Sequence, residues 1–164
     1  MVRDFVIRRA RAGDVPAIVA MLADDALGRT REDPSLPVRA EYVTAFEAID
    51  RDPNQHLVVA EKDGVVIGCL QLTFIPGLSR MGGWRGQIES VRVAASCRGQ
   101  GLGRQIFEWA IGECRRRRCA QVQLTTDKVR ADAQRFYLSL GFVASHEGMK
   151  LLLDDRQALR ERSA

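Results

Sequence analysis

The chain has 164 residues, enough for one domain with a substantial hydrophobic core. Its 46% hydrophobic and 28% charged residues, with a formal net charge of +4, exclude a disordered or collagen-like protein. No apolar run approaches the roughly 20 residues that a bilayer span needs, and the first five residues lack a signal region, so a cytoplasmic protein without a membrane segment is expected. A single domain over 1–164 is predicted, with a polar tail at 154–164 that frays.

The first half of the chain has the periodicities of a strand, two helices and a strand hairpin. Asp14 is expected to cap the first helix. The Asp63-Gly64 pair between the hairpin strands is typical of a tight turn. A glycine-rich loop over 76–86 follows, of the kind that often borders a substrate. In chain order, the predicted elements are a strand at 5–9, a helix from 15 to about 22, a helix from 38 to 49, and strands at 57–60 and 65–75.

The second half centres on a strand at 88–93 that leads through a glycine-rich loop, Arg98 to Arg104, into a helix. Three glycines allow successive backbone N–H groups to point at one ligand, and a helix N-terminus adds partial positive charge. The loop therefore predicts a site for a phosphate or pyrophosphate. A flexible loop without a ligand is the alternative, which the flanking arginines disfavour.

Glycine spacing separates the known kinds of phosphate loop. A Walker loop needs Lys-Ser or Lys-Thr after its last glycine, where this chain has Arg104-Gln105. A dinucleotide fingerprint needs G-x-G-x-x-G in the first strand–helix turn, whereas this chain has G-x-G-x-G after more than half its length. The remaining pattern, Arg-x-x-Gly-x-Gly at Arg98, Gly101 and Gly103, resembles the acetyl-CoA motif of the GNAT superfamily of N-acetyltransferases.

The elements after the loop agree with this resemblance. The strand at 120–125, reached through a helix, implies a parallel crossover. A last helix ends at Gly141, and a strand pair is predicted at 142–145 and 149–153. The order of elements over the whole chain resembles the GNAT fold. This resemblance implies an α+β protein with a mixed, mostly antiparallel, splayed sheet and helices on both faces.

The resemblance also implies how acetyl-CoA is held. The main chain at 91–93 should bind the pantetheine arm, the loop should bind the pyrophosphate, and Tyr137 should lie near the thioester sulfur. Arg130 stands where many members have an asparagine that touches the pantetheine, and its role is left open. The implied cofactor-binding residues are Val91, Arg92, Val93, Arg98, Gly99, Gln100, Gly101, Leu102, Gly103, Arg104, Arg130, Ala133 and Tyr137.

Acetyl transfer to an amine needs a proton acceptor and a proton donor. Glu89 alternates with Val91 and Val93, so it is expected to be a partly desolvated carboxylate suited to act as general base. The alternative is a structural ion pair with Arg85 or Arg92. Tyr137 carries a phenol that can protonate the leaving thiolate. The alternative interpretation of Tyr137 is a residue that only packs in the core.

The resulting hypothesis is an acetyl-CoA-dependent N-acetyltransferase acting on a primary amine of a small molecule in a ternary complex. One rival is a protein-lysine or N-terminal acetyltransferase, for which Asp24, Asp25, Glu32 and Asp33 could line an acidic groove. Another is a non-catalytic acyl-CoA sensor. A third is a nucleic-acid-binding module using Arg115 to Arg118, although this run is better explained as the end of a helix and no nucleic-acid partner is expected. The resemblance is compatible with a homodimer.

Four cysteines and two histidines show no metal-ligand spacing. No zinc site, other metal site or disulfide framework is therefore predicted. Cys97, beside the loop arginines, is interpreted as a small loop residue in preference to a covalent nucleophile.

Overall fold

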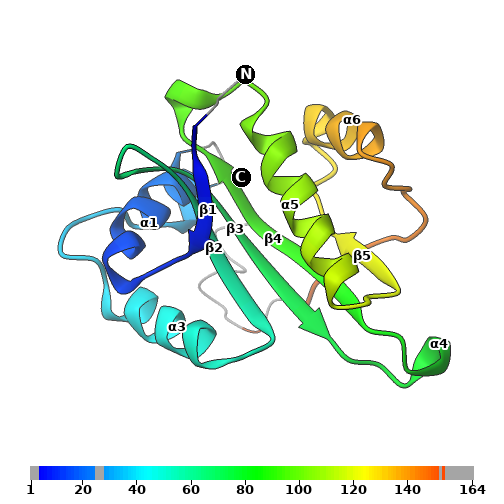
Figure 1. Cartoon of the computed structure of the whole chain (residues 1–164). Coiled ribbons are helices and arrows are strands. Elements are labelled where there is room, and N and C mark those ends of the chain that lie inside the picture. Colours follow the sequence, from blue (N-terminus) through cyan, green and yellow to red (C-terminus); the bar gives the residue numbers. More distant parts are fainter. Residues whose placement is uncertain (1–3, 25–27, 152, 154–164) are drawn as a thin grey trace. The chain divides into compact units, whose positions relative to one another are not determined.

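The computed structural model describes residues 4–24, 28–151 and 153. Contacts divide the chain into two compact units, residues 1–124 and 125–164. The first unit contains the sheet and five helices of the described chain, and the second contains one helix and the segment that follows it (Figure 1). Among the described residues, no helix has the length and apolar content needed to cross a membrane.

Five strands form one sheet in the order β1-β2-β3-β4-β5. The three pairings from β1 to β4 are antiparallel, and β4 and β5 are parallel. The parallel pair results from the crossover through α5, as predicted from the sequence. The strands are β1 (Val6–Arg9), β2 (Gln55–Lys62), β3 (Val65–Ile75), β4 (Arg85–Val93) and β5 (Gln121–Leu124).

The hairpin between β2 and β3 closes as the Asp-Gly pair indicates. Asp63 and Gly64 both have positive φ, 51° and 78°, and Lys62 pairs directly with Val65. Two consecutive positive φ angles define the tight turn whose twist matches that of the flanking strands.

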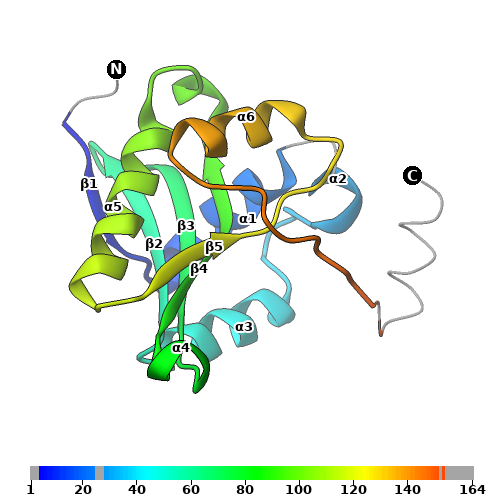
Figure 2. The ribbon, with the colours of Figure 1, turned by 90° about the vertical axis from the view of Figure 1, so that its right-hand side faces the viewer.

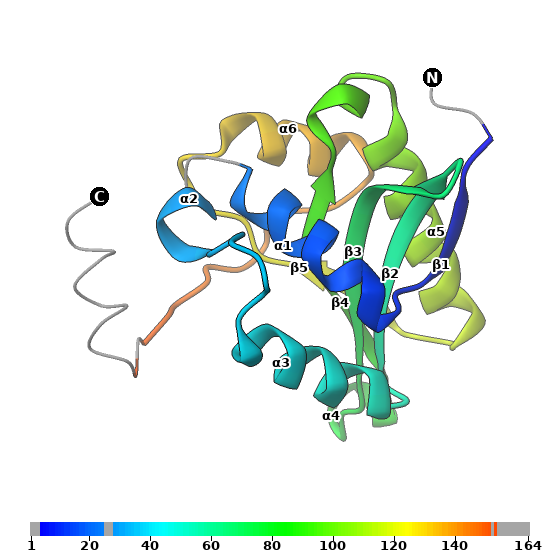
Figure 3. The same ribbon diagram turned by 90° about the vertical axis from the view of Figure 1, so that its left-hand side faces the viewer.

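Helices cover both faces of this sheet. In Figure 1 the sheet lies between α1 and α3 on its left and α5 on its right, and Figures 2 and 3 show these two sides in turn. This arrangement confirms the predicted α+β architecture. The helices of the first unit are α1 (Val15–Ala23), α2 (Gly28–Arg31), α3 (Ala40–Arg51), α4 (Ser79–Gly82) and α5 (Leu102–Arg116).

Each covered face of the sheet has its own apolar core. On one side, Val59 and Cys69 of the sheet pack with apolar residues of α1 and α3, including Ile18, Val19 and Phe46. On the side of α5, the strands contribute residues that are at most 2% exposed, and α5 contributes Leu102, Ile106, Phe107 and Ala110. The strand residues are Val58, Leu70, Leu72, Phe74 and Ile88.

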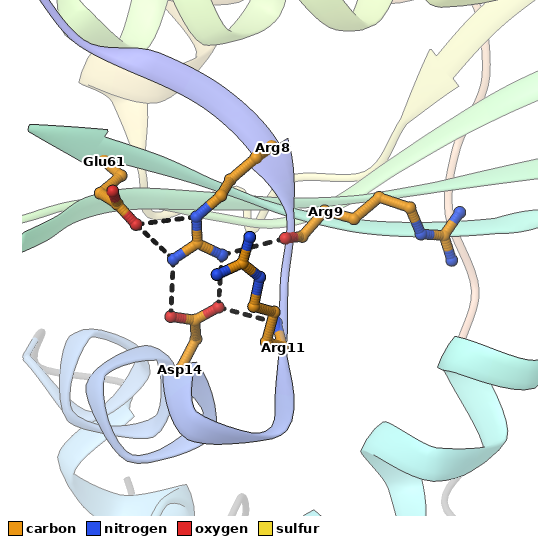
Figure 4. Close-up of polar contacts among 5 residues, drawn as sticks. All are labelled: Arg8, Arg9, Arg11, Asp14 and Glu61. Atoms are coloured by element: carbon orange, nitrogen blue, oxygen red, sulfur yellow. Dashed lines mark hydrogen bonds and ion pairs between the residues drawn. The ribbon is translucent and has the colours of Figure 1, made fainter. Parts of the chain in front are cut away.

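Asp14 does not cap α1 as predicted. Its side chain binds the guanidinium of Arg8 and accepts a hydrogen bond from the backbone N–H of Arg11 at 2.7 Å (Figure 4). A short 3-10 turn at Ala12–Asp14 comes immediately before the helix, so the carboxylate faces β1 and not the first N–H groups of α1. Arg8, six residues earlier on β1, competes successfully for this carboxylate.

The second unit contains α6 (Ala131–Ser139), and Gly141, with a φ of 90°, follows its end as expected. The predicted strand pair at 142–145 and 149–153 is wrong for the described residues, which are not in strand conformation. Met149, Leu151 and Leu153 keep the alternating pattern but are 92%, 85% and 91% exposed. Such a pattern forms a strand only with a neighbour to pair with, and this unit has no strand among its described residues.

Candidate functional site

The sheet opens along β4. The parallel pairing with β5 joins Arg85 to Gln121 at one end and Ile88 to Leu124 at the other. Within the described residues, the stretch of β4 from Glu89 to Val93 has no strand partner on this side. The open edge exposes main-chain groups that an extended ligand can bind as a further strand.

A β-bulge lies at the start of this open edge. Gln71 of β3 faces Glu89, but Cys69 faces Arg92, so Leu70 opposes two residues of β4. Ser90 has a φ of 52°, a left-handed conformation that is rare for a residue with a Cβ. The thiol of Cys69 donates to the carbonyl of Ser90 at 3.5 Å, which holds the bulge against β3.

Because of the bulge, Glu89 does not share a face of the strand with Val93, although the sequence predicted that it would. Opposed residues of an antiparallel pair share a face, so Glu89 and Arg92 lie on the face of Gln71 and Cys69. Val93, opposite Gly68, lies on the other face. The alternation of Glu89 with Val93 is therefore interrupted by the extra residue.

Glu89 itself is exposed, so the expectation of a partly desolvated carboxylate is wrong. Among the described residues it forms no ion pair, with either Arg85 or Arg92. Arg92 instead donates from Nη1 to the carbonyl of Val91 at 2.9 Å. The carboxylate is thus open to solvent, beside the stretch of β4 that has no strand partner on the β5 side in the described residues.

The glycine loop has the backbone geometry of an anion site. Gly99 and Gly101 have φ angles of 72° and 81°, and α5 begins immediately afterwards at Leu102. A Cβ built on Gly99 meets no atom within 4 Å, so a ligand has free access to the main chain there. Gly103 and Arg104 belong to the first turn of the helix, and the side chain of Leu102 is buried in the core. Any contact of Leu102 with a ligand therefore involves its main chain.

Arg98 links this loop to the end of α1. Its Nη2 donates to Asp24 Oδ2 at 2.7 Å and to the Asp24 carbonyl at 3.1 Å, while its Nε donates to the carbonyl of Val93 at 3.2 Å. No sequence signal pointed to Asp24 as the partner, because 74 residues separate the two. Gln100 is similarly engaged, since its side-chain amide donates to the carbonyl of Ser96 at 2.8 Å.

The predicted site residues of the second unit all belong to α6 or its first flanking position. Arg130 is exposed at the position that precedes the helix, and Ala133 is half-buried. Tyr137 is half-buried between aromatic rings, with ring centroids 5.7 Å from Phe136 and 6.2 Å from Phe142. These contacts fix the orientation of the phenol ring within this unit.

The arginine run forms the end of α5, as predicted. Arg118 has a φ of 56° and donates its N–H to the carbonyl of Arg115, while the N–H of Cys119 binds the carbonyl of Cys114. These two bonds complete a Schellman motif. The guanidinium of Arg117 stacks over Phe74, 4.0 Å from the ring centroid, so this arginine is not simply solvated.

Cysteine chemistry in the first unit is limited by burial. Burial raises the pKa of the Cys69 thiol to about 12, and that of Cys114 to about 12 with the neighbouring Cys119 thiol as a second cause. Among the described residues, no three His, Cys, Asp or Glu side chains gather in a group suited to a metal ion.

Comparison with known proteins agrees with the open sheet and the glycine loop. The model of the acetyltransferase (GNAT) family matches residues 20–142. The chain therefore belongs to this family, and the acetyltransferase class predicted from the sequence is confirmed.

One curated relative is similar to this chain over part of its length. An aminoalkylphosphonate N-acetyltransferase from Salmonella typhimurium is 37% identical over 101 residues, which make up 62% of this chain and 65% of that protein. The chain thus matches just under two thirds of the length of this curated relative.

Two solved structures share the fold over most of the chain. A transcriptional regulator from Bacillus halodurans C-125 is 49% identical, with a TM-score of 0.88 over 91% of this chain and 99% of its own. A putative acetyltransferase from Agrobacterium tumefaciens is 27% identical, with a TM-score of 0.79 over 90% of this chain and 99% of its own.

Proposed function

We propose that the chain is an acetyl-CoA-dependent N-acetyltransferase that acetylates a primary amine of a small molecule by direct attack in a ternary complex. The observation that carries the proposal is the continuity of the open β4 edge with the left-handed glycines and the start of α5. A strand edge suits the amide groups of a pantetheine arm, and the glycine turn suits the pyrophosphate that follows.

The residues present fit acetyl-CoA. The accessible backbone at Gly99, the positive φ of Gly101 and the N-terminus of α5 favour an anion. Arg104 is exposed in the first turn of the helix and adds positive charge. Arg98 supports the loop by holding the carbonyl of Val93 and the end of α1. Bound acetyl-CoA supplies the acetyl group as a thioester.

An alkylammonium loses two protons on becoming an amide. Glu89 takes the first, and the second is released to solvent, from which the phenol that protonates the leaving thiolate regains its own proton. An alkyl amine with a pKa of about 10.4 costs roughly 4 to 5 kcal/mol to present as a neutral nucleophile at pH 7. Glu89 accepts this proton through water, a role consistent with its exposure and its lack of an ion pair in the described structure. The backbone N–H of Val91 donates a hydrogen bond to the carbonyl oxygen of the thioester as negative charge develops on that oxygen.

The leaving sulfur has to gain a proton. A thiolate with a pKa of about 8.5 can take a proton from a phenol with a pKa of about 10 when the two groups are held together. Tyr137 provides this phenol, and its packing against Phe136 and Phe142 limits the motion of the ring. The new N–C bond forms as the C–S bond breaks, so no covalent enzyme intermediate is required.

The acidic residues between the first helices support a small acceptor over a peptide, because they already have hydrogen-bond or ion-pair partners within the protein. Asp24 pairs with Arg98, Glu32 accepts a hydrogen bond from Tyr42 at 2.8 Å, and Asp33 accepts one from the N–H of Ser35 at 3.0 Å. Asp25 lies outside the described residues. Internal partners thus occupy the carboxylates that a basic peptide would need. The relative from Salmonella typhimurium is named for an aminoalkylphosphonate, which is itself a small amine.

A second candidate function is suggested by the relative described as a transcriptional regulator. Arg115 to Arg118 are exposed at the end of α5 and would provide the positive charge for a nucleic acid. Arg117 is engaged with Phe74, and Arg116 forms an ion pair with Glu113, which leaves a small surface for such a role. We therefore rank this candidate below the enzyme.

Release of free thiol from acetyl-CoA across a panel of small amines, lysine peptides and N-terminal peptides tests the proposal. Turnover with a small amine is expected. Calorimetry with CoA on Gly101→Glu is the matched binding test, because a side chain and a negative charge at this left-handed position should abolish binding. Absence of CoA binding by the wild-type protein, together with tight binding of duplex DNA, would reverse the ranking of the two candidates.

A further inference from the structure

Six polar side chains form a band across four strands on the sheet face that carries α1 and α3, the side turned to the viewer in Figure 3. All are half-buried. Strand spacing makes the band about 14 Å wide from β2 to β5. We call this band the amide stripe; its members are Gln55, Gln71, Thr73, Gln87, Gln121 and Gln123.

Hydrogen bonds join the members of the amide stripe. Gln71 and Thr73 both donate to Gln55 Oε1, at 3.1 and 2.8 Å. Gln123 donates to Gln87 Oε1 at 2.7 Å, and Gln121 donates to Gln123 Oε1 at 3.1 Å. Apart from the half-buried His56, opposite Leu72, the other face of the same strands is apolar where α5 covers it. The polar side chains are therefore confined to one face of the sheet. If this part of the face served only for packing, we would expect apolar residues there.

The stripe is continuous with the proposed catalytic carboxylate. Gln71 lies directly opposite Glu89, and Gln87 precedes Glu89 by two residues on the same face of β4. Two residues of a strand correspond to roughly 7 Å. An amine that reaches Glu89 therefore places the rest of its molecule over the amides.

The charges around the stripe are placed at its margins. Glu89 lies at one end of its β4 segment and Arg85 at the other, with Arg85 Nη1 directed toward Gly77, 3.7 Å from where a Cβ would stand. Arg9, beside Gln55, donates to the Gln55 carbonyl and pairs with Asp50. None of the six members carries a charge, so an anionic body held over the stripe loses hydration without gaining an ion pair unless it extends as far as Arg85, which lies opposite Gln121.

We propose that the amide stripe binds the body of the acetyl acceptor, and that this acceptor is a primary amine bearing several hydroxyl groups. The inference rests on the proposed acetyltransferase function. A carboxamide presents both donors and an acceptor, and a hydroxyl does the same, so a polyhydroxylated body satisfies the stripe from one side to the other. An apolar body would leave the amide donors and acceptors that the hydrogen bonds within the stripe do not use without partners, which disfavours it.

The test compares glucosamine with hexylamine and 2-aminoethylphosphonate, by calorimetry in the presence of CoA and by turnover with acetyl-CoA. Glucosamine should bind at least about tenfold more tightly than the other two. In Gln87→Met/Gln123→Met, which removes both partners of one hydrogen bond, its affinity should fall about tenfold. Binding of acetyl-CoA should stay unchanged, and hexylamine should bind at least as tightly as it does to the wild type, because the variant removes amides that an apolar body leaves without partners. Gln134→Met, on the exposed face of α6, is the matched control and should behave as wild type.

Thr73→Val is the second test if the double variant does not fold. It keeps the shape of the side chain and removes the hydroxyl that donates to Gln55. Equal affinity for the three amines, an unaffected double variant, or a preference for a peptide amine would overturn the inference while leaving acetyl transfer intact. Failure of the wild-type protein to bind acetyl-CoA would instead overturn the proposed function. Calorimetry with glucosamine in the absence of CoA still decides the role of the stripe in that case.

Discussion

The guanidinium of Arg8 binds both carboxylate oxygens of Asp14, at 2.7 Å through Nη1 and 2.9 Å through Nη2. On its other side the same guanidinium binds Glu61, through Nε at 2.7 Å and also through Nη2. Figure 4 shows this arrangement of the three side chains. Asp14 is only 9% exposed, so its carboxylate is shielded from water. One side chain of β1 thereby joins the start of α1 to β2.

Asp14→Ala should lower the free energy of unfolding by about 2 to 3 kcal/mol, since it removes three hydrogen bonds to a buried carboxylate. Glu61 still neutralises Arg8, so the loss should stay below that of a fully unpaired buried charge. Urea denaturation measures the change. Asp50→Ala is the control, because the exposed Asp50–Arg9 pair is 3.9 Å apart and should contribute under about 0.5 kcal/mol.

The same pair makes stability depend on acid pH. The hydrogen bond from Arg8 holds the pKa of Asp14 below its ordinary value, against the opposing effect of burial. Because the folded pKa is the lower one, the contribution is complete above the unfolded pKa of about 3.9 and is lost as pH falls through the folded value. The difference in unfolding free energy between wild type and Asp14→Ala should therefore be constant from pH 7 to 5 and shrink below about pH 4. A difference that grows in acid would contradict the assignment.

Gly86→Ala should destabilise the first unit by about 1 to 3 kcal/mol, the usual cost of overpacking. A Cβ there would overlap Cys114 Sγ and contact Leu72 Cδ1 at 3.6 Å. Thermal or urea unfolding measures the loss. Gly13→Ala is the matched control, since a Cβ on Gly13 meets no atom within 4 Å and should change stability little.

The double variant Gly86→Ala/Cys114→Ala identifies the cause of that loss. Removing the sulfur should make room for the methyl group introduced at position 86, so the double variant should be more stable than the sum of the two single changes predicts. Simple additivity would mean that the strand backbone, and not the thiol, resists the new methyl group.

Local signals predicted most of the fold. The turn at Asp63-Gly64 and the crossover through α5 follow from residues close together in the chain, whose backbone preferences act at short range. The segment 142–153 shows the limit of such signals. Its alternation resembles that of a strand, but pairing depends on a partner that the pattern does not specify.

The site was predictable in its backbone outline and less so in its side chains. The positive φ of Gly101 and the start of α5 agree with the motif, because glycine spacing directly constrains the main chain. The bulge at Ser90 has no local signal, since a serine in a left-handed conformation is imposed by the register of β3 and β4. The partner of Arg98 was hidden for a related reason, as Asp24 meets it only after folding.

Glu89→Gln should lower turnover most near neutral pH and recover part of it above about pH 9, where more of the amine is deprotonated without help. The substitution keeps the size of an exposed side chain, so stability should not change. A pH–rate profile from about pH 6 to 10 on both proteins decides the role. Parallel profiles would show that Glu89 does not accept the proton.

Tyr137→Phe should reduce kcat by roughly 10²- to 10⁴-fold, the usual contribution of a positioned proton donor, and leave the affinity for acetyl-CoA unchanged. Only the hydroxyl is lost, because the ring contacts with Phe136 and Phe142 do not involve it. Steady-state kinetics under conditions where chemistry limits the rate, combined with calorimetry for cofactor binding, separate the two quantities. Phe142→Leu is the control for packing, since it alters the ring contact and retains the phenol. Rates of Tyr137→Phe within about twofold of wild type would make Tyr137 a packing residue, with solvent as the proton donor to the leaving thiolate.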